Sequence, residues 1–338
     1  MVSNSLKFPD FNPPDIWKAK KFLKPYIFHT PILYSPNLSR RTGCHVYLKM
    51  ECWQIQGCFK VRGAIFKVSQ LSEEQRQNGL LTCSSGNHGT ALAYAASLFG
   101  KPPTKVFLPT NAEPAKVSKI SNLGAETVFH GKDYLEALQG ALSYLETNGG
   151  TYVHSHGDPL VIAGQGTIGL EIMEDLPDVE AVIVPVGGGG LMAGIATSIK
   201  ALAPQVRLFG VEAAAAPGAY LSFKDGFCHE TVAIKPSVAD GLMGTLTPLT
   251  FDITYPLVES IQVMSEPEII YAMQILQKDD QIMVEGSAAV GIAALLSGKQ
   301  DLQGKKVIVV LTGRNINADQ FNKLMTNPIN PLAQGEYQ

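Results

Sequence analysis

The sequence predicts an α/β protein in which helices cover mainly parallel, twisted sheets. Short apolar runs alternate with helix-like stretches along most of the chain, a pattern typical of strands joined by crossover helices. The length of 338 residues is enough for two lobes, at roughly 150 residues per domain. Hydrophobic residues make up 45% and charged residues 17%, an ordinary globular composition that excludes a mainly disordered or fibrous chain.

Each element is predicted from an apolar run or from helical periodicity between turn residues. Strands are predicted at 46–49, 80–83, 105–108, 126–129, 181–186, 207–211, 257–263 and 306–311. Helices are predicted at 63–71, 89–99, 115–123, 134–147, 166–175, 191–202, 266–277 and 287–296. The helix at 266–277 follows Ser265, whose side-chain oxygen can accept a hydrogen bond from a free amide of the first turn.

Charge and cysteine content restrict the partners and the compartment. Lys and Arg total 27 against 30 Asp and Glu, so a net charge of −3 provides no positive field for nucleic acid. The 5 cysteines form no CxxC pair, which favours a reducing cytoplasm. No signal-peptide pattern and no run of ~18 apolar residues is found in the sequence. We therefore expect a soluble, cytoplasmic protein with a small-molecule substrate and with neither nucleic acid nor membrane as a partner.

Four segments rich in small residues stand at or near the ends of predicted strands. They are 56–60 (QGCFK), 84–89 (SSGNHG), 187–190 (GGGG) and 312–315 (TGRN). In parallel α/β sheets the carboxyl ends of the strands form the ligand site, so we expect these segments to converge there.

The glycine run from Gly187 to Gly190 follows a strand and opens a helix. Its exposed amides and the helix N-terminus together favour a phosphate site. Gly188, Gly190 and Ala193 also fit the spacing of a dinucleotide fingerprint, with Glu212 at the end of the next strand. The run alone leaves a turn, a phosphate site and a dinucleotide site open.

Lys60 lies among small and aromatic neighbours near a predicted helix start. Desolvation and a helix N-terminus both favour the neutral amine, which is the form that reacts with an aldehyde. Taken alone, the residue is better explained as a solvated surface lysine, because lysine side chains are usually solvated.

Five motifs in one order resemble the pyridoxal-phosphate (PLP) enzymes of fold type II, the tryptophan synthase β-like family, and within it the serine/threonine dehydratase and serine racemase group. The motifs stand at 49–64, 84–89, 161–167, 185–194 and 312–315, and the similarity runs from about Thr30 to about Asn317. The resemblance implies a two-lobed fold, PLP as cofactor and a homodimer. It also implies a large cofactor-binding domain of 1–56 and 153–325, a small substrate-side domain of 57–152 and a loose tail of 326–338.

The resemblance also assigns roles to individual residues. Lys60 would bind the cofactor's aldehyde and then take the Cα proton of the substrate, and Phe59 would support the ring. Asn87 would bind the phenolic oxygen, while Thr312 would face the pyridine nitrogen, which suits elimination or racemisation better than transamination. The phosphate would be held by the backbone amides of Gly187, Gly188, Gly189 and Gly190. The substrate carboxylate would be held by Ser84, Ser85, Gly86, Asn87 and His88.

Some positions depart from the pattern of this group. Cys58 and Gly244 stand where Ser is common, and Thr90 stands where Gln is common. His154 and His156 precede the third motif, where a short polar group is usual. These histidines either recognise a second polar group on the substrate or are satisfied within their loop.

The cation site of the racemase-like members is incomplete in this sequence. Glu212 is present, but Gly218 stands where a second acid is expected. A divalent cation such as Mg²⁺ or Ca²⁺ would therefore be held at Glu212 only weakly. Asp240 and Glu285 match acidic positions near the same site.

These observations predict a PLP-dependent ammonia-lyase that removes water from a small β-hydroxy amino acid such as L-threonine or L-serine, giving a 2-oxo acid and ammonia. The alternatives are a serine-type racemase, in which Ser85 would serve the opposite face of the substrate, and a 3-hydroxyaspartate or hydroxyectoine-pathway dehydratase. An NAD(P)-dependent oxidoreductase would leave Lys60 without a role. A silent PLP-binding protein would leave Ser85 without one.

Overall fold

The computed structural model describes residues 11–84, 86–327 and 329. Its strands are β1 (Ile32–Tyr34), β2 (His45–Lys49), β3 (Leu80–Cys83), β4 (Thr104–Leu108), β5 (Glu126–Phe129), β6 (Thr151–Tyr152), β7 (Ala181–Pro185), β8 (Arg207–Ala213), β9 (Ser260–Met264) and β10 (Lys306–Val310). Its α-helices are α1 (Asp15–Leu23), α2 (Pro36–Thr42), α3 (Lys60–Gln70), α4 (Glu73–Gln77), α5 (Asn87–Leu98), α6 (Pro114–Ser121), α7 (Tyr134–Asn148), α8 (Pro159–Asp175), α9 (Gly190–Leu202), α10 (Gly218–Asp225), α11 (Pro248–Thr254), α12 (Glu266–Asp279), α13 (Gly286–Ser297) and α14 (Ala318–Thr326). Short 3-10 turns are η1 (Glu51–Trp53), η2 (Ile55–Gly57) and η3 (Asp240–Leu242).

The larger sheet has six strands in the order β1-β2-β10-β7-β8-β9. Only the β1–β2 pair in it is antiparallel, so the sheet is mainly parallel. Alternate residues of a strand point to opposite faces. Accordingly, Ile183 of β7 belongs to the core cluster that contains α13, while Val182 and Val184 belong to the cluster that contains α9. The sheet is thus covered by helices on both faces, as the fold class predicts.

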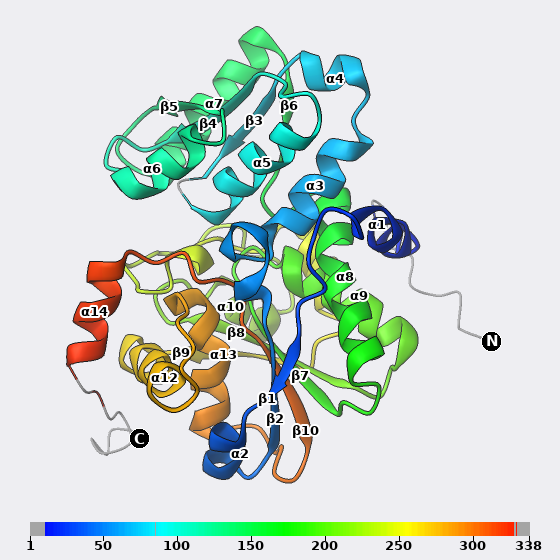
Figure 1. The fold of residues 1–338 in the computed structure, drawn as a ribbon, viewed down its shortest axis with the longest axis vertical. Coiled ribbons are helices and arrows are strands. Elements are labelled where there is room, and N and C mark those ends of the chain that lie inside the picture. Colours follow the sequence, from blue (N-terminus) through cyan, green and yellow to red (C-terminus); the bar gives the residue numbers. More distant parts are fainter. Residues whose placement is uncertain (1–10, 85, 328, 330–338) are drawn as a thin grey trace.

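The smaller sheet has four parallel strands in the order β5-β4-β3-β6. Figure 1 shows it with α5, α6 and α7 as a separate body beside the larger one. Helix α3 joins the two bodies, because it packs on both α5 and α8. All four strands fall within 57–152, the range expected for the small domain, although the domain boundaries themselves stay predictions.

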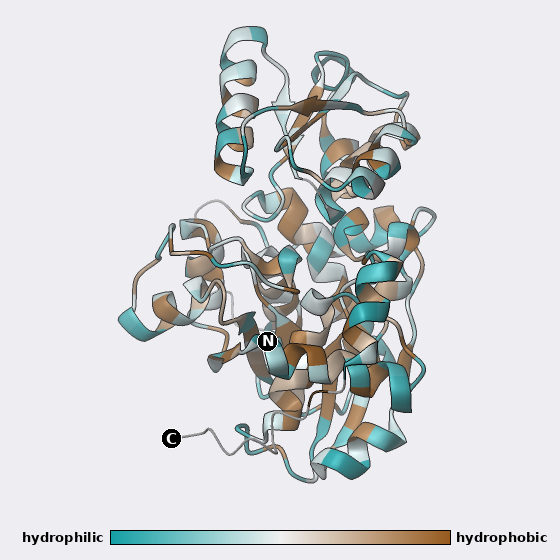
Figure 2. Ribbon diagram, turned by 90° about the vertical axis from the view of Figure 1, so that its left-hand side faces the viewer, coloured by the Kyte–Doolittle hydropathy of each residue, from teal (hydrophilic) through white to brown (hydrophobic). Residues whose placement is uncertain are grey.

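Hydropathy follows this architecture. In Figure 2 the strands and inner helices are largely hydrophobic, whereas the outer helices carry hydrophilic surfaces. Among the described residues, no helix is long and apolar enough to span a membrane. Burial of apolar surface in the two bodies is therefore the main source of stability.

Several element boundaries were predicted correctly and others were wrong. The strands predicted at 80–83 and 126–129 match β3 and β5 residue for residue. The strand predicted at 257–263 starts too early, because the amides of Leu257 and Val258 bond to the carbonyl of Thr254 at the end of α11. The short strands β1 and β6 and the helices α1, α2, α4, α10, α11 and α14 were missed. Of the tail predicted at 326–338, Thr326 ends α14, while residues 328 and 330–338 lie outside the described part of the chain.

The start of α8 is the largest error in the predicted helices. The helix was expected from 166 but begins at Pro159, where the Asp158 carboxylate accepts bonds from the first-turn amides. Gly164 and Gly166 stand at the wrongly predicted boundary, and glycine lowers helix propensity. Tertiary packing requires them: a Cβ at Gly164 would lie 2.6 Å from the carbonyl oxygen of Arg62 in α3.

Candidate active site

Lys60 is the first residue of α3, and its Nζ donates a hydrogen bond to the carbonyl oxygen of Ser155 at 2.9 Å. Nζ lies 5.2 Å from the centroid of the Phe59 ring. Desolvation lowers the pKa of the amine to about 8, against the opposing influence of Cys58 and Glu285. More of the amine is therefore neutral near neutral pH than in an ordinary lysine, and this is the form that acts as a nucleophile or base.

The lysine motif is joined directly to the segment that follows β10. The amide of Phe59 donates to the carbonyl of Thr312 at 3.2 Å, and Cys58 forms an antiparallel bridge with Gly313. Thr312 is buried. Burial also raises the pKa of the Cys58 thiol to about 12, so this sulfur is a neutral thiol. The structure therefore brings together Lys60 and Thr312, which are far apart in the sequence.

A chain of side-chain hydrogen bonds fixes the orientation of Asn87 at the start of α5. The Asn87 amide nitrogen donates to Glu285 Oε1 at 2.8 Å, and its Oδ1 accepts from Asn315 Nδ2 at 2.6 Å. The Asn315 backbone amide bonds to Glu285 Oε2, and Lys119 Nζ bonds to Asn315 Oδ1 at 2.7 Å. Because an amide NH₂ carries two donor hydrogens, Asn87 retains one for a ligand.

Glu285 is the acidic centre of this chain of bonds. Burial raises the pKa of its carboxyl to about 7, and the nearby Asp240 carboxylate adds to this effect. Bonds from Asn315 and Asn87 act in the opposite direction. Glu285 therefore gains or loses a proton near neutral pH.

The glycine run links β7 to the N-terminus of α9. Gly189 has a φ of +81°, a conformation that strongly favours glycine. The backbone N–H groups of Gly188, Gly189 and Gly190 donate no hydrogen bond to any residue that the structure describes. These amides stand at the positive end of a helix of 13 residues, which is an arrangement suited to a phosphate.

The expected substrate loop precedes α5. Ser84 Oγ accepts a hydrogen bond from the amide of Gly86 at 3.3 Å, and an added Cβ at Gly86 would meet no atom within 4 Å. His88 is buried, with Nε2 at 3.0 Å from the carbonyl of Val153, and desolvation lowers its pKa to about 3. His88 is thus held as a neutral ring inside the small body, while Ser85 lies outside the described residues.

Glu212 lies away from this cluster at the end of β8. Its two carboxylate oxygens accept bonds from the amides of Ala219 and Tyr220, at 2.9 and 2.8 Å, in the first turn of α10. Burial raises the pKa of the carboxyl to about 8. Within the described part of the chain, no group of three or more His, Cys, Asp or Glu residues is placed to hold a metal ion. The cation at Glu212 stays a prediction.

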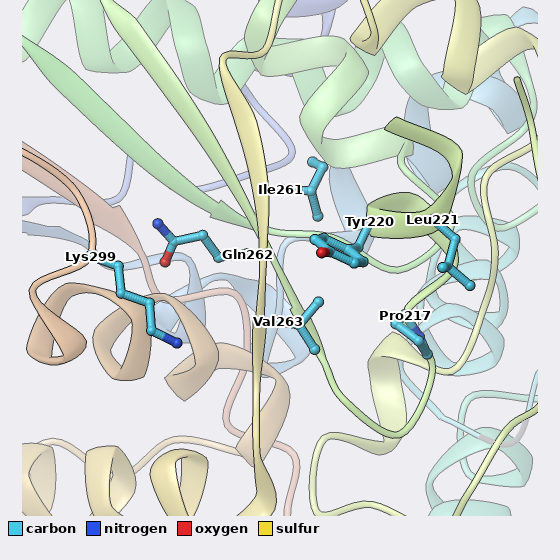
Figure 3. A pocket seen from close by; sticks show the side chains of 7 residues that line it. All are labelled: Pro217, Tyr220, Leu221, Ile261, Gln262, Val263 and Lys299. Atoms are coloured by element: carbon cyan, nitrogen blue, oxygen red, sulfur yellow. The ribbon is translucent and has the colours of Figure 1, made fainter. Parts of the chain in front are cut away.

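A cavity of about 540 Å³ lies beside the edge strand β9 and α10. Figure 3 shows its lining, with Tyr220 and Gln262 on different sides of the strand. None of the site residues predicted from the sequence lines it. It is therefore separate from the arrangement around Lys60.

The sequence interpretation missed two contacts that complete the site. The carbonyl of Ser155 receives the Lys60 bond, and Lys119 reaches Asn315 from α6. Asn315 was noticed only as part of a motif, where its place after Thr312 and Gly313 was the available signal. Ser155 and Lys119 carry no local signal, because only the tertiary fold brings them to the site.

Comparison with known proteins identifies the family of the chain. The pyridoxal-phosphate dependent enzyme family matches residues 23–313. The chain belongs to this family. This pyridoxal-phosphate dependent enzyme is 43% identical to an L-threonine ammonia-lyase of Thermotoga maritima, over 92% of the chain and 77% of the relative. It is 38% identical to the catabolic L-threonine dehydratase of Escherichia coli, over 92% of the chain and 94% of the relative.

Solved structures of the family share the fold. Maize serine racemase superposes with a TM-score of 0.88 at 30% identity, covering 94% of this chain and 97% of that one. Threonine deaminase isoform 2 of Solanum lycopersicum gives a TM-score of 0.86 at 29% identity, covering 96% of this chain and 92% of that one. This pyridoxal-phosphate dependent enzyme therefore has the α/β fold type II architecture that its motifs predict.

The site fits the cofactor for which the family is named. The unpaired amides of the glycine run suit a phosphate, and the Lys60 amine suits an aldehyde. A Cβ at Gly188 would lie 2.2 Å from the His156 ring, so no larger residue fits in the run at that position. The two chemical ends of the cofactor thus find complementary groups in one region of the enzyme.

Proposed function

We propose that this pyridoxal-phosphate dependent enzyme is an ammonia-lyase that dehydrates L-threonine or L-serine. The observation that carries the proposal is the 43% identity with an L-threonine ammonia-lyase over 92% of the chain. Loss of the Cα proton and the β-hydroxyl removes one water, and hydrolysis of the C–N bond consumes one water. The products are a 2-oxo acid and ammonia.

The residues around Lys60 carry the chemistry. Lys60 would hold the cofactor through its aldehyde, and as a neutral amine Nζ would take the Cα proton of the substrate. The cofactor, when bound, stabilises the negative charge that develops at Cα. Asn87 donates its free amide hydrogen to the phenolic oxygen, and Thr312 offers a neutral hydroxyl to the pyridine nitrogen. Phe59 supports the ring.

Two other segments would hold the anionic groups, which are the cofactor phosphate and the substrate carboxylate. Backbone amides of the glycine run bind the cofactor phosphate, through Gly187, Gly188, Gly189 and Gly190. The loop before α5 binds the substrate carboxylate, through Ser84, Ser85, Gly86 and Asn87. His88 supports this loop from inside the small body, since its ring is bonded to Val153.

A serine-type racemase is the second candidate, and the likeness to maize serine racemase favours it. Racemisation needs an acid on the face opposite Lys60, the role proposed for Ser85. Elimination needs only an aligned, protonated β-hydroxyl. The positions Cys58, Thr90 and Gly244 depart from the racemase pattern, so we propose elimination as the dominant reaction.

The decisive experiment offers the purified holoenzyme a panel of amino acids, with both 2-oxo acid and inverted enantiomer measured. We expect ammonia and 2-oxo acid from L-threonine or L-serine, with little inversion. Ser85→Ala should abolish inversion and any use of D-substrate but retain part of the L-dehydration, since a lost general acid costs ~10²–10⁴-fold only in its own step. Inversion faster than ammonia release in the unmodified enzyme would replace the lyase by the racemase.

We further propose that the enzyme is a cytoplasmic homodimer. The 5 cysteines support a reducing compartment, because none of them forms a disulfide in the structure. The dimer is supported by the fold family resemblance. Light scattering of the purified enzyme tests the dimer, and fractionation of cells tests the compartment.

A further inference from the structure

The segment from His154 to Gly157 connects Lys60 with the glycine run. The Ser155 carbonyl accepts the Lys60 bond, and its hydroxyl lies 2.9 Å from Nδ1 of His156. His156 follows directly and packs its ring on Gly188, where a Cβ would come within 2.2 Å of the ring. One short turn therefore touches both the lysine and the run of free amides.

The Cε1 edge of the His156 ring lies beside Gly244, which has no side chain. A Cβ at Gly244 would meet Gly188 N at 3.5 Å and His156 Cε1 at 3.7 Å, both ordinary contact distances. The amide of Gly188 and the imidazole edge thus border one position. Nδ1 is occupied by Ser155, whereas Nε2, adjacent to Cε1, forms no hydrogen bond with the residues that the structure describes.

We propose that His156 Nε2 donates a hydrogen bond to the phosphate of the bound cofactor, beside the amide of Gly188. The inference rests on the cofactor of the family and assigns it a side-chain ligand in addition to the backbone amides. The proposal also accounts for glycine at position 244. The His156 imidazole provides the polar group that the hydroxyl of a serine at that position would otherwise provide.

The neighbouring serine is compatible with the tautomer that this bond needs, because a hydroxyl at 2.9 Å can donate to Nδ1. When the Ser155 hydroxyl donates to Nδ1, the proton of a neutral imidazole is on Nε2. Desolvation lowers the pKa of His156 well below its ordinary value, and the Lys60 charge acts in the same direction. The ring is therefore neutral and has one N–H to offer.

The test compares two cofactor forms on enzyme stripped of its cofactor. PLP and pyridoxal, which lacks the phosphate, are titrated by absorbance into the unmodified protein and into His156→Phe, which keeps a ring against Gly188 but has no donor. We expect His156→Phe to weaken PLP binding roughly 10- to 100-fold, the effect of one hydrogen bond to a charged group, and to leave pyridoxal binding unchanged. Inorganic phosphate should compete with pyridoxal-phosphate less effectively in the variant.

A rescue variant and a control variant distinguish loss of the proposed phosphate bond from a disturbance of the packing around His156. Gly244→Ser added to His156→Phe should recover much of the lost PLP affinity, because the new hydroxyl enters the same position. His45→Phe, at the exposed first residue of β2, should change nothing. If the affinities for pyridoxal and PLP fall equally, His156 acts only through packing and the proposal is wrong. If KM for the substrate rises while the PLP affinity is unchanged, His156 binds the substrate and not the phosphate. Turnover of L-threonine by the unmodified enzyme tests the proposed function separately.

Discussion

Lys60 and the glycine run have separate proposed roles. Lys60 Nζ is the proposed nucleophile and base, whereas backbone amides of the glycine run would hold the phosphate. Lys60 Nζ donates its hydrogen bond to the Ser155 carbonyl, so a backbone group and not a carboxylate positions the amine. Binding and proton transfer therefore use different groups.

Lys60→Ala should retain the cofactor and lose turnover. We expect activity to fall by at least ~10²–10⁴-fold, the usual contribution of a general base, while cofactor remains bound through the phosphate. Cofactor content is measured by absorbance after denaturation, and activity by release of 2-oxo acid. Lys132→Ala, on the exposed surface, is the matched control. Comparable turnover in the two variants would exclude Lys60 as the base.

Glu285 should make the protein without cofactor less stable as the pH rises. Its pKa is about 7 in the folded state against an ordinary 4.5, so between these values the folded state holds a proton that the unfolded chain has lost. Stability from this group is therefore present below the ordinary pKa and is lost as the pH rises through about 7. In Glu285→Gln the difference in free energy of unfolding between about pH 5 and about pH 8 should shrink.

Denaturant unfolding at the two pH values measures this difference. Glu180→Gln is the control, because bonds from Lys306 and Lys305 lower the pKa of Glu180. Its contribution to the pH dependence of the free energy of unfolding therefore has the opposite sign to that of Glu285. An exposed acid with a lowered pKa stabilises the folded state more as the pH rises. Equal pH slopes in the unmodified protein and Glu285→Gln would show that Glu285 is ionised throughout.

At the scale of elements, a buried network of charges joins α3 to α8 and β2. Arg62 bonds to Glu171 at 2.6 Å and to Glu51 at 2.7 Å, and Lys49 bonds to Glu171 at 2.6 Å. All four side chains are buried. Because Arg62 lies two residues after Lys60 in α3, the network fixes the helix turn that presents the lysine.

Glu171→Gln should destabilise the enzyme by about 3–5 kcal/mol, since it leaves two buried cations with one carboxylate. Urea unfolding of the holoenzyme measures this change. Lys305→Ala breaks the exposed pair with Glu180 and should cost less than about 1 kcal/mol. A loss in Glu171→Gln as small as in this control would mean that water or a neighbouring acid compensates the charge.

At the scale of the whole molecule, α6 holds the small body against the large one. Lys119 bonds to Asn315 and to the carbonyl of Gln56, and Lys116 pairs with Asp240 in η3. Lys119 therefore links α6 of the small body to Asn315, whose side-chain amide orients Asn87. Lys116 makes a pair with an exposed acid that lies outside this chain of bonds.

Lys119→Met should lower kcat/KM by roughly tenfold, because Asn315 loses a charged donor and Asn87 is held less firmly. Lys116→Met, the matched control on the same helix, should have a smaller effect, since exposed ion pairs contribute little. Steady-state kinetics measures both, and hydrogen exchange in α6 shows whether the small body has loosened. An equal effect of the two substitutions would assign α6 a purely mechanical role.

Much of the fold follows from local sequence because its elements agree with local preference. The apolar runs of β3 and β5 are bounded by turn residues, and both strands were predicted at their correct ends. The first half of α8 was not, because its glycines disfavour a helix unless α3 and α9 pack closely on them. Burial in the assembled core provides that stabilisation, and no short window of sequence contains it.

The motifs were sufficient to predict the family and its cofactor, and the family comparison confirms both. The glycine run and Thr312 follow the neighbouring parallel strands β7 and β10, which bring their ends together, whereas Lys60 and Asn87 open the helices α3 and α5. Only the tertiary structure decided which atoms meet: the Ser155 carbonyl on Lys60, Glu285 between Asn87 and Asn315, and His156 against Gly188. It also placed Glu212 at the N-terminus of α10. The physical reason is that residue type and spacing are local properties, whereas hydrogen-bond partners and burial depend on segments from distant parts of the chain packing together.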